Sequence, residues 1–92
     1  MRQVIWSSEA TDDLFGISDR YELIDPQLAE TMLDRIRIGP AALLDAPHIG
    51  SPVLDADRKW RVAGTPFLLF YTVASEAITI LRVRHARSDW KR

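Results

Sequence analysis

Basic side chains and one histidine are the residues of this sequence that could do chemistry. Arg58, Lys59 and Arg61 lie close together in one segment, and His85 and Arg87 follow another segment near the C-terminus. Arginine and lysine bind phosphate oxygens and stabilise developing negative charge, while histidine exchanges protons near neutral pH. If the two segments are neighbours in a sheet, these residues would form either a site that cleaves RNA or a surface that binds an acidic partner.

A purely structural role for the same residues stays open. Arg82 and Arg84 belong to the same basic group, and such side chains commonly cover the solvent face of an antiparallel sheet. A histidine that ends a strand, such as His85, more often hydrogen-bonds the backbone than reacts. Trp90 either docks on the sheet and holds the C-terminal tail or contacts a partner, since tryptophan is enriched at interface hot spots.

Metal, cofactor and nucleophile sites find little support in the sequence. The chain has no cysteine and two histidines, which excludes thiolate ligands and disulfides and argues against a zinc site. It contains no glycine-rich phosphate loop and no nucleophile elbow. Asp12 and Asp13 are adjacent acids, but adjacent helical positions do not face each other, so we expect solvated surface groups. No metal and no cofactor are therefore expected.

Length and charge distribution describe a small domain with two different sides. The 92 residues predict one domain over residues 1–92. No stretch approaches the roughly 18 apolar residues of a membrane span, and no signal peptide opens the chain, so we expect a cytoplasmic protein with no membrane partner. Residues 1–46 carry nine acids and four arginines, whereas residues 47–92 carry four acids and eight bases. This asymmetry indicates an acidic helical side and a basic sheet side, unless the acids merely solubilise the helices.

The strands that must position the basic residues are centred on Pro66–His85. Its two β-prone runs are separated by Ser75 and Glu76 and predict an antiparallel hairpin. Arg58–Ala63 predicts a further strand with Trp60 and Val62 on one face, and Gln3–Trp6 predicts a strand at the N-terminus. Glycine, proline and aspartate in His48–Asp57 predict a loop.

Two consecutive helices are expected between the first and second strands. Ser7 or Ser8 caps the first helix, whose apolar residues recur at helical spacing up to Ile24. Gly16 within it is unfavourable by about 1 kcal/mol relative to alanine, which suggests close packing against a neighbouring element.

The second helix begins at Asp25-Pro26 and continues, with a kink at Gly39-Pro40, towards Leu43. The predicted order is β-α-α-β-β-β. This order is typical of an α+β fold with a helical hairpin packed on one face of a small, mostly antiparallel sheet.

Four segments together resemble the RelE/ParE superfamily of toxins from bacterial type II toxin–antitoxin systems. They read VIWSSEATDDLFGISDRYEL, PHIGSPV, RKWRVAGTPFLLFYTV and ITILRVRHARSDW, and they extend from the first strand to Trp90. The order and spacing of the segments are more specific than any one of them. The resemblance implies two helices on a mostly antiparallel sheet, in agreement with the order predicted above. It also implies a cognate antitoxin as partner, with operator DNA contacted only through that antitoxin.

The superfamily contains two activities, and the sequence departs from the pattern of one. RelE-like members are ribosome-dependent mRNA interferases, whereas ParE-like members inhibit DNA gyrase by binding it. Lys59 and Arg61 match the basic pair on the second strand of the mRNA-cleaving pattern. Leu68 stands where that pattern has an arginine in the third strand, Ser88 stands at the basic position after the last strand, and no tyrosine follows Trp90.

The segments VRHAR and GTPFLLFY look like the ParE branch, and the first hypothesis follows that branch. It describes a non-enzymatic toxin of the plasmid-stabilisation type that arrests growth by binding DNA gyrase and is neutralised by its antitoxin. The residues expected to bind the target or the antitoxin are Arg58, Lys59, Arg61, His85, Arg87 and Trp90.

Two other hypotheses stay open. In the second hypothesis, the protein is an mRNA interferase with His85 as acid or base and with Arg61 and Arg87 on the scissile phosphate. In the third hypothesis, the toxin has lost its activity and persists as an antitoxin-binding partner.

Overall fold

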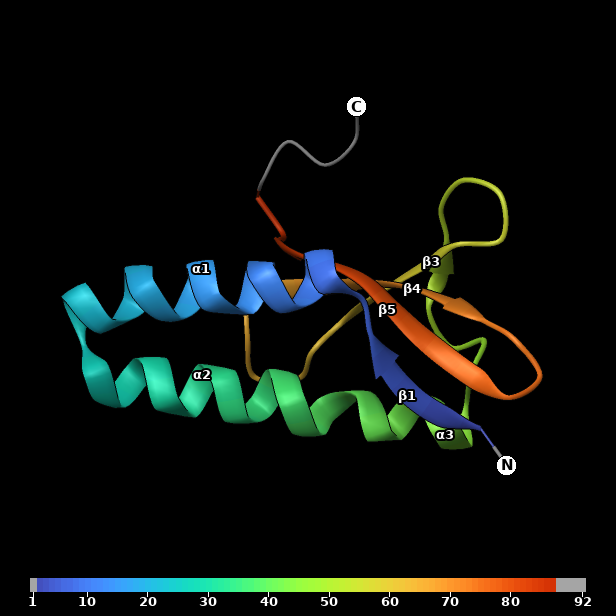
Figure 1. The fold of residues 1–92 in the computed structure, drawn as a ribbon, viewed down its shortest axis with the longest axis horizontal. Coiled ribbons are helices and arrows are strands. Elements are labelled where there is room, and N and C mark those ends of the chain that lie inside the picture. Colours follow the sequence, from blue (N-terminus) through green and yellow to red (C-terminus); the bar gives the residue numbers. More distant parts are fainter. Residues whose placement is uncertain (1, 88–92) are drawn as a thin grey trace.

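Two long helices pack on one face of a five-stranded sheet (Figure 1). A computed structural model of the protein describes residues 2–87. The strands lie in the order β1-β5-β4-β3-β2; β1 is parallel to β5 and the other neighbouring pairs are antiparallel. The strands are β1 (Gln3–Trp6), β2 (Ser51–Pro52), β3 (Arg58–Arg61), β4 (Phe67–Val73) and β5 (Ala77–His85). The predicted α+β fold with a helical hairpin on one face of a mostly antiparallel sheet is confirmed.

The predicted hairpin forms the centre of the sheet. β4 and β5 pair from Phe67 opposite His85 to Val73 opposite Ile78. A register shift leaves Leu81 without a partner, because Tyr71 pairs with Ile80 and Phe70 pairs with Arg82. This β-bulge changes the phase of the alternation along β5, so the next buried residue after Ile80 is Val83.

The first helix, α1 (Ser8–Ile24), begins at a serine cap and covers the sheet with one apolar side. The Ser7 hydroxyl accepts the Ala10 N–H at 3.0 Å and donates to the Leu81 carbonyl at 2.9 Å, which fixes the start of the helix to the bulge in β5. Ala10 and Ile17 are buried against the sheet. Gly16 points away from it, and a Cβ added there would meet nothing within 4 Å. The prediction that Gly16 packs closely against a neighbouring element of this chain is therefore wrong.

The second helix is interrupted where the sequence predicts a kink. It comprises α2 (Pro26–Ile38), a 3-10 turn (Gly39–Ala41) and the short α3 (Ala42–Asp45). The Asp25 side chain caps α2 by accepting backbone N–H groups of Gln27 and Leu28. Leu43, beyond the kink, is fully buried, so the apolar stripe continues across the break as predicted. A Cβ on Gly39 would lie 3.0 Å from Val62 Cγ1, which is a reason for glycine at the kink.

A buried tyrosine hydroxyl organises the loop that follows α3. Tyr71 donates to the Pro47 carbonyl at 2.8 Å and accepts the Gly50 N–H at 3.0 Å. A Cβ on Gly50 would lie 2.5 Å from the Tyr71 hydroxyl oxygen and 2.7 Å from the Lys59 carbonyl oxygen, so this position requires glycine. The expected loop also contains the two-residue strand β2, which pairs with β3. The prediction of a loop throughout His48–Asp57 missed it, because Ser51–Pro52 has no strand pattern of its own.

Helices long and apolar enough to cross a membrane are absent from the part of the chain that the structure describes.

Candidate target-binding surface

The two faces of the sheet carry different side chains because neighbouring residues of a strand point to opposite faces. Phe67, Leu69 and Tyr71 of β4 are buried on the helix-covered face. The alternating residues Leu68 and Phe70 therefore lie on the other face, which no helix of residues 2–87 covers (Figure 1). Pairing with β3 and β5 surrounds them with basic residues. We call this surface the open face; its residues are Lys59, Arg61, Leu68, Phe70, Arg82 and Arg84.

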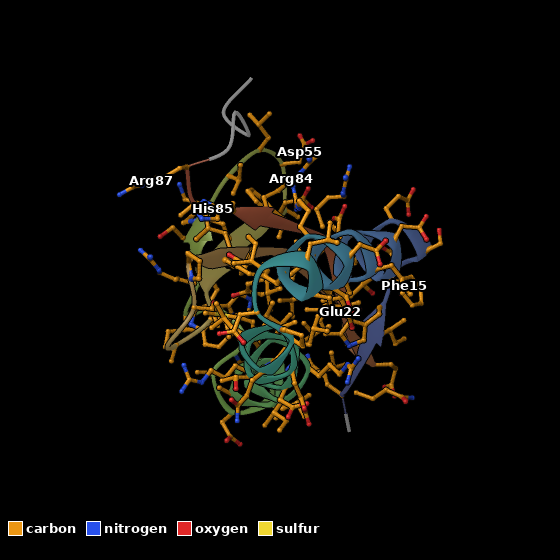
Figure 2. The ribbon with its side chains drawn as sticks, turned by 90° about the vertical axis from the view of Figure 1, so that its left-hand side faces the viewer. Phe15, Glu22, Asp55, Arg84, His85 and Arg87 are labelled. Carbon is orange, nitrogen blue, oxygen red and sulfur yellow. The ribbon has the colours of Figure 1, made fainter. Side chains whose placement is uncertain are left out.

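Two basic residues lie directly beside Leu68 on the open face. Arg61 of β3 and Arg84 of β5 are its cross-strand partners on either side. Arg61 is exposed, and its Nε donates to the Thr65 carbonyl at 3.2 Å, a contact within the β3–β4 turn. Arg84 is the next-to-last residue of β5, which ends at His85, and both residues are labelled in Figure 2. The open face thus has an apolar centre with positive charge on both sides.

Arg82 is bound to a carboxylate at the edge of the open face. Its Nε and Nη2 donate to the two carboxylate oxygens of Asp13, each at 2.9 Å. The Val83 N–H also donates to Asp13, at 2.9 Å. β1 ends at Trp6, which pairs with Ile80 of β5. Beyond that point β1 no longer borders β5, and the Asp13 carboxylate accepts the Val83 N–H there. The prediction that Asp13 is a solvated surface group is wrong, since its side chain is 16% exposed.

The contacts of Asp13 also change its acidity. Burial raises the pKa of Asp13, but the hydrogen bonds from Arg82 and Val83 and the charges of Arg82 and Arg84 lower it by more. The net pKa of Asp13 is below the usual value, and hydrogen bonding to Asp13 raises the pKa of Arg82. This ion pair reduces the positive charge that Arg82 presents, so Lys59, Arg61 and Arg84 carry most of the charge of the open face.

Arg58 lies on the opposite side of the sheet from Lys59 and Arg61. It pairs with the buried Tyr71, and its Nη1 donates to the carbonyls of His48 at 3.1 Å and Gly50 at 2.7 Å. These bonds hold the loop that the Tyr71 hydroxyl also binds. The contacts of Arg58 are thus made within the chain.

His85 also lies on the helix-covered side, at the end of β5 (Figure 2). It pairs with the buried Phe67, and the two rings meet edge to face with centroids 5.5 Å apart. Its Nδ1 accepts the Arg87 N–H at 3.1 Å. Arg20, Tyr21 and Ile24 of α1 complete a hollow of about 290 Å³ beside the two rings.

The predicted site residues do not all lie on the same side of the sheet. Lys59 and Arg61 are together on the open face, whereas Arg58 and His85 are on the helix-covered side. Arg87 is exposed just beyond β5. Trp90 lies outside the described residues.

Sequence reasoning missed the apolar centre of the open face and did not place Arg84 there. The alternation of Phe67, Leu69 and Tyr71 was a usable signal for Leu68 and Phe70. The face on which Arg84 lies depends on the bulge at Leu81, which the sequence pattern does not reveal. Over residues 2–87, histidine, aspartate and glutamate form no cluster of three or more that could hold a metal ion.

Comparisons with known proteins agree with the fold and the order of segments. The profile of the ParE toxin of the type II toxin–antitoxin system parDE matches residues 4–90. Toxin RelE2 of Caulobacter vibrioides is 31% identical over 86 residues, which cover 94% of this chain and 97% of the relative.

Solved structures share the architecture. A chain of the chromosomal ParDE system from P. aeruginosa superposes with a TM-score of 0.81 at 24% identity, covering 92% of this chain and 96% of the other. YafQ from E. coli superposes with a TM-score of 0.52 at 15% identity, covering 92% and 93%. The match over residues 4–90 and the relative at 31% identity establish that the chain belongs to the ParE toxin family of type II toxin–antitoxin systems, within the RelE/ParE superfamily.

Proposed function

We propose that this toxin arrests growth by binding DNA gyrase through the open face of its sheet, and that a cognate antitoxin neutralises it. The observation that carries the proposal is the juxtaposition of Leu68 and Phe70 with Lys59, Arg61 and Arg84. Protein interfaces typically have an apolar centre, and arginine is enriched at their hot spots. Positive charge on both sides of Leu68 suits an acidic surface on the target.

The placement of His85 favours binding over RNA cleavage. Acid–base catalysis on a phosphodiester needs the histidine and the phosphate-binding arginine to reach the same substrate atoms. Arg61 and His85 start from opposite faces of the sheet, because their partners Leu68 and Phe67 are adjacent in β4. In addition, an apolar side chain, Leu68, occupies the centre of the basic surface, where a phosphate would prefer a cation.

An mRNA interferase is the second candidate, because the curated relative is named RelE2. In this alternative Arg61 and Arg87 bind the scissile phosphate and His85 transfers the proton. The positive charge of the open face would then attract the RNA backbone without regard to sequence.

Expression of the toxin with and without its antitoxin distinguishes the candidates. The gyrase proposal predicts growth arrest with DNA damage and intact message, and rescue by the antitoxin. Cleavage of ribosome-bound message that is abolished by His85→Ala would instead establish the interferase. Harmless expression without antitoxin would contradict both candidates and indicate a toxin that has lost its activity.

A further inference from the structure

The chain leaves the sheet beside a hollow that is lined with aromatic rings. β5 ends at His85, and this ring borders the hollow of about 290 Å³ together with Phe67 of β4 and with Arg20, Tyr21 and Ile24 of α1. The Phe67 ring meets the His85 ring edge to face, with centroids 5.5 Å apart. It meets the Tyr21 ring in the same way, with centroids 6.0 Å apart. The three rings thus form one wall of the hollow, to which both the sheet and α1 contribute.

The hollow is deep at the sheet and uncovered at the helix. Phe67 is 2% exposed, whereas Ile24, the last residue of α1, is 77% exposed, and Arg20 is exposed beside it. An apolar group that fills such a hollow removes apolar surface from water, which stabilises the filled state. The volume is at the lower limit of the pockets that hold small-molecule ligands. The hollow therefore suits one large side chain better than it suits a cofactor.

The lining of the hollow is chemically matched to an indole ring. Aromatic rings pack edge to face with centroids about 4.5–7 Å apart, so Tyr21 and His85 can each contact a further ring as they contact Phe67. An arginine near the face of an aromatic ring adds a cation–π interaction, which is strongest with tryptophan, and Arg20 is placed for it. Tryptophan is thus the side chain that uses every part of this lining.

Trp90 lies within reach of the hollow, in the segment that follows the described residues. It comes three residues after Arg87, and three residues of extended chain span at most about 10–11 Å. Arg87 is itself held at the hollow, because its N–H donates to His85 Nδ1 at 3.1 Å. The Ala86 N–H donates to the Pro66 carbonyl at 2.8 Å, which ties the chain to the start of β4. His85 and Arg87 lie together at this end of the sheet (Figure 2).

We infer that Trp90 folds back onto the helix-covered side of the sheet and fills this hollow. Its ring packs on Phe67 and His85, and Ile24 covers it from α1. The inference concerns the toxin alone and does not depend on the proposed target. It assigns Trp90 to the core of the toxin instead of to a partner interface. It also holds the chain on both sides of Arg87, a predicted binding residue.

Contacts of the indole ring can be measured directly in the full-length wild-type toxin. In isotopically labelled protein, nuclear Overhauser effects should join the indole protons of Trp90 to the methyl groups of Ile24. The methyl signals of Ile24 should shift on Trp90→Ala, because they lose the ring current of the indole. The methyl signals of Leu23, which is 89% exposed and outside the hollow, should not shift. Absence of the Overhauser effects, or Ile24 signals that stay in place, would overturn the inference.

Thermal denaturation of single and double variants measures the same contact as a coupling. Trp90→Ala should lower the melting temperature by about 4–8 °C. Ile24→Ala should lower it by at least about 2 °C more in the wild-type background than in the Trp90→Ala background, since the contact is already lost in the latter. Leu23→Ala is the matched control and should have the same small effect in both backgrounds. Lys91→Ala, next to Trp90, should melt like wild type.

Two results of this cycle would overturn the inference. One is a Trp90→Ala variant that melts at the temperature of wild type. The other is an effect of Ile24→Ala that is equal in both backgrounds.

Dilution shows whether the hollow receives the tryptophan of its own chain. For an intramolecular contact, the melting temperature and the Overhauser effects between Trp90 and Ile24 should be independent of toxin concentration, since no second molecule takes part. Overhauser effects that disappear on dilution would show that the tryptophan enters the hollow of a second copy, which would overturn the inference.

Discussion

Replacement of Asp13 by alanine should destabilise the toxin far more than the same change at the adjacent Asp12. Asp13 accepts two hydrogen bonds from Arg82 and one from the Val83 N–H. Asp12 is exposed, lies in the same turn of α1 and has the same charge. The pair of variants therefore separates the contacts of Asp13 from general effects of removing a helical acid.

The expected magnitude follows from the three bonds. Asp13→Ala leaves the part-buried Val83 N–H without its acceptor, which costs about 1–3 kcal/mol. Loss of the ion pair adds up to about 1 kcal/mol, because the Arg82 side chain is 39% exposed and water screens the pair. The free energy of unfolding should fall by about 2–3 kcal/mol, against less than about 0.5 kcal/mol for Asp12→Ala. Arg82→Ala should give an intermediate loss, since Val83 keeps its bond.

The stabilisation by Asp13 should depend on pH with a definite sign. The folded-state pKa of Asp13 is lower than 3.8, its usual value, so the contribution is fully present above that value and is lost as the pH falls through the folded pKa. Wild type and Asp13→Asn should thus differ most above about pH 4 and converge in stronger acid.

Urea denaturation of wild type and the four variants at pH 7, repeated in acid, measures these differences. Equal stability of Asp13→Ala and Asp12→Ala would refute the reasoning, as would a gap between wild type and Asp13→Asn that does not shrink at low pH.

Two further predictions concern the loop held by Tyr71. Tyr71→Phe should lower the free energy of unfolding by about 1–3 kcal/mol, because the buried Gly50 N–H loses its acceptor and the Pro47 carbonyl loses its donor. Urea denaturation measures this loss, and a midpoint equal to that of wild type would contradict the prediction. Gly50→Ala should lower the free energy of unfolding by a similar amount or more, because the new Cβ would lie 2.7 Å from the backbone carbonyl oxygen of Lys59. A melting temperature equal to that of wild type would contradict this prediction and show that the loop relaxes freely.

The order of elements could be predicted because each has a strong local pattern. The apolar run of β4, the alternation in β5 and the caps at Ser7 and Asp25 all depend on neighbouring residues in the sequence. The kink at Gly39-Pro40 was also predictable, since proline and glycine disfavour an uninterrupted helix wherever they occur.

Features that depend on distant residues were not predictable in the same way. The roles of Asp13 and Gly50 depend on partners in β5 and β4, and nothing near either residue in the sequence indicates them. The bulge at Leu81 decides that Arg84 faces away from the helices, whereas an unbroken alternation from Ile80 would place it on the helix-covered side. The prediction for Gly16 was wrong because Gly16 lies off the apolar stripe of α1, on the side of the helix that faces away from the sheet.

The most direct test of the central claim is inhibition of DNA gyrase by the purified toxin. Wild-type toxin should block supercoiling of relaxed plasmid, and a double variant Arg61→Ala, Arg84→Ala should need at least about tenfold more protein for the same inhibition. The control Arg37→Ala removes an exposed arginine from α2 and should inhibit like wild type. Normal supercoiling at saturating wild-type toxin, or equal potency of the double variant, would contradict the account.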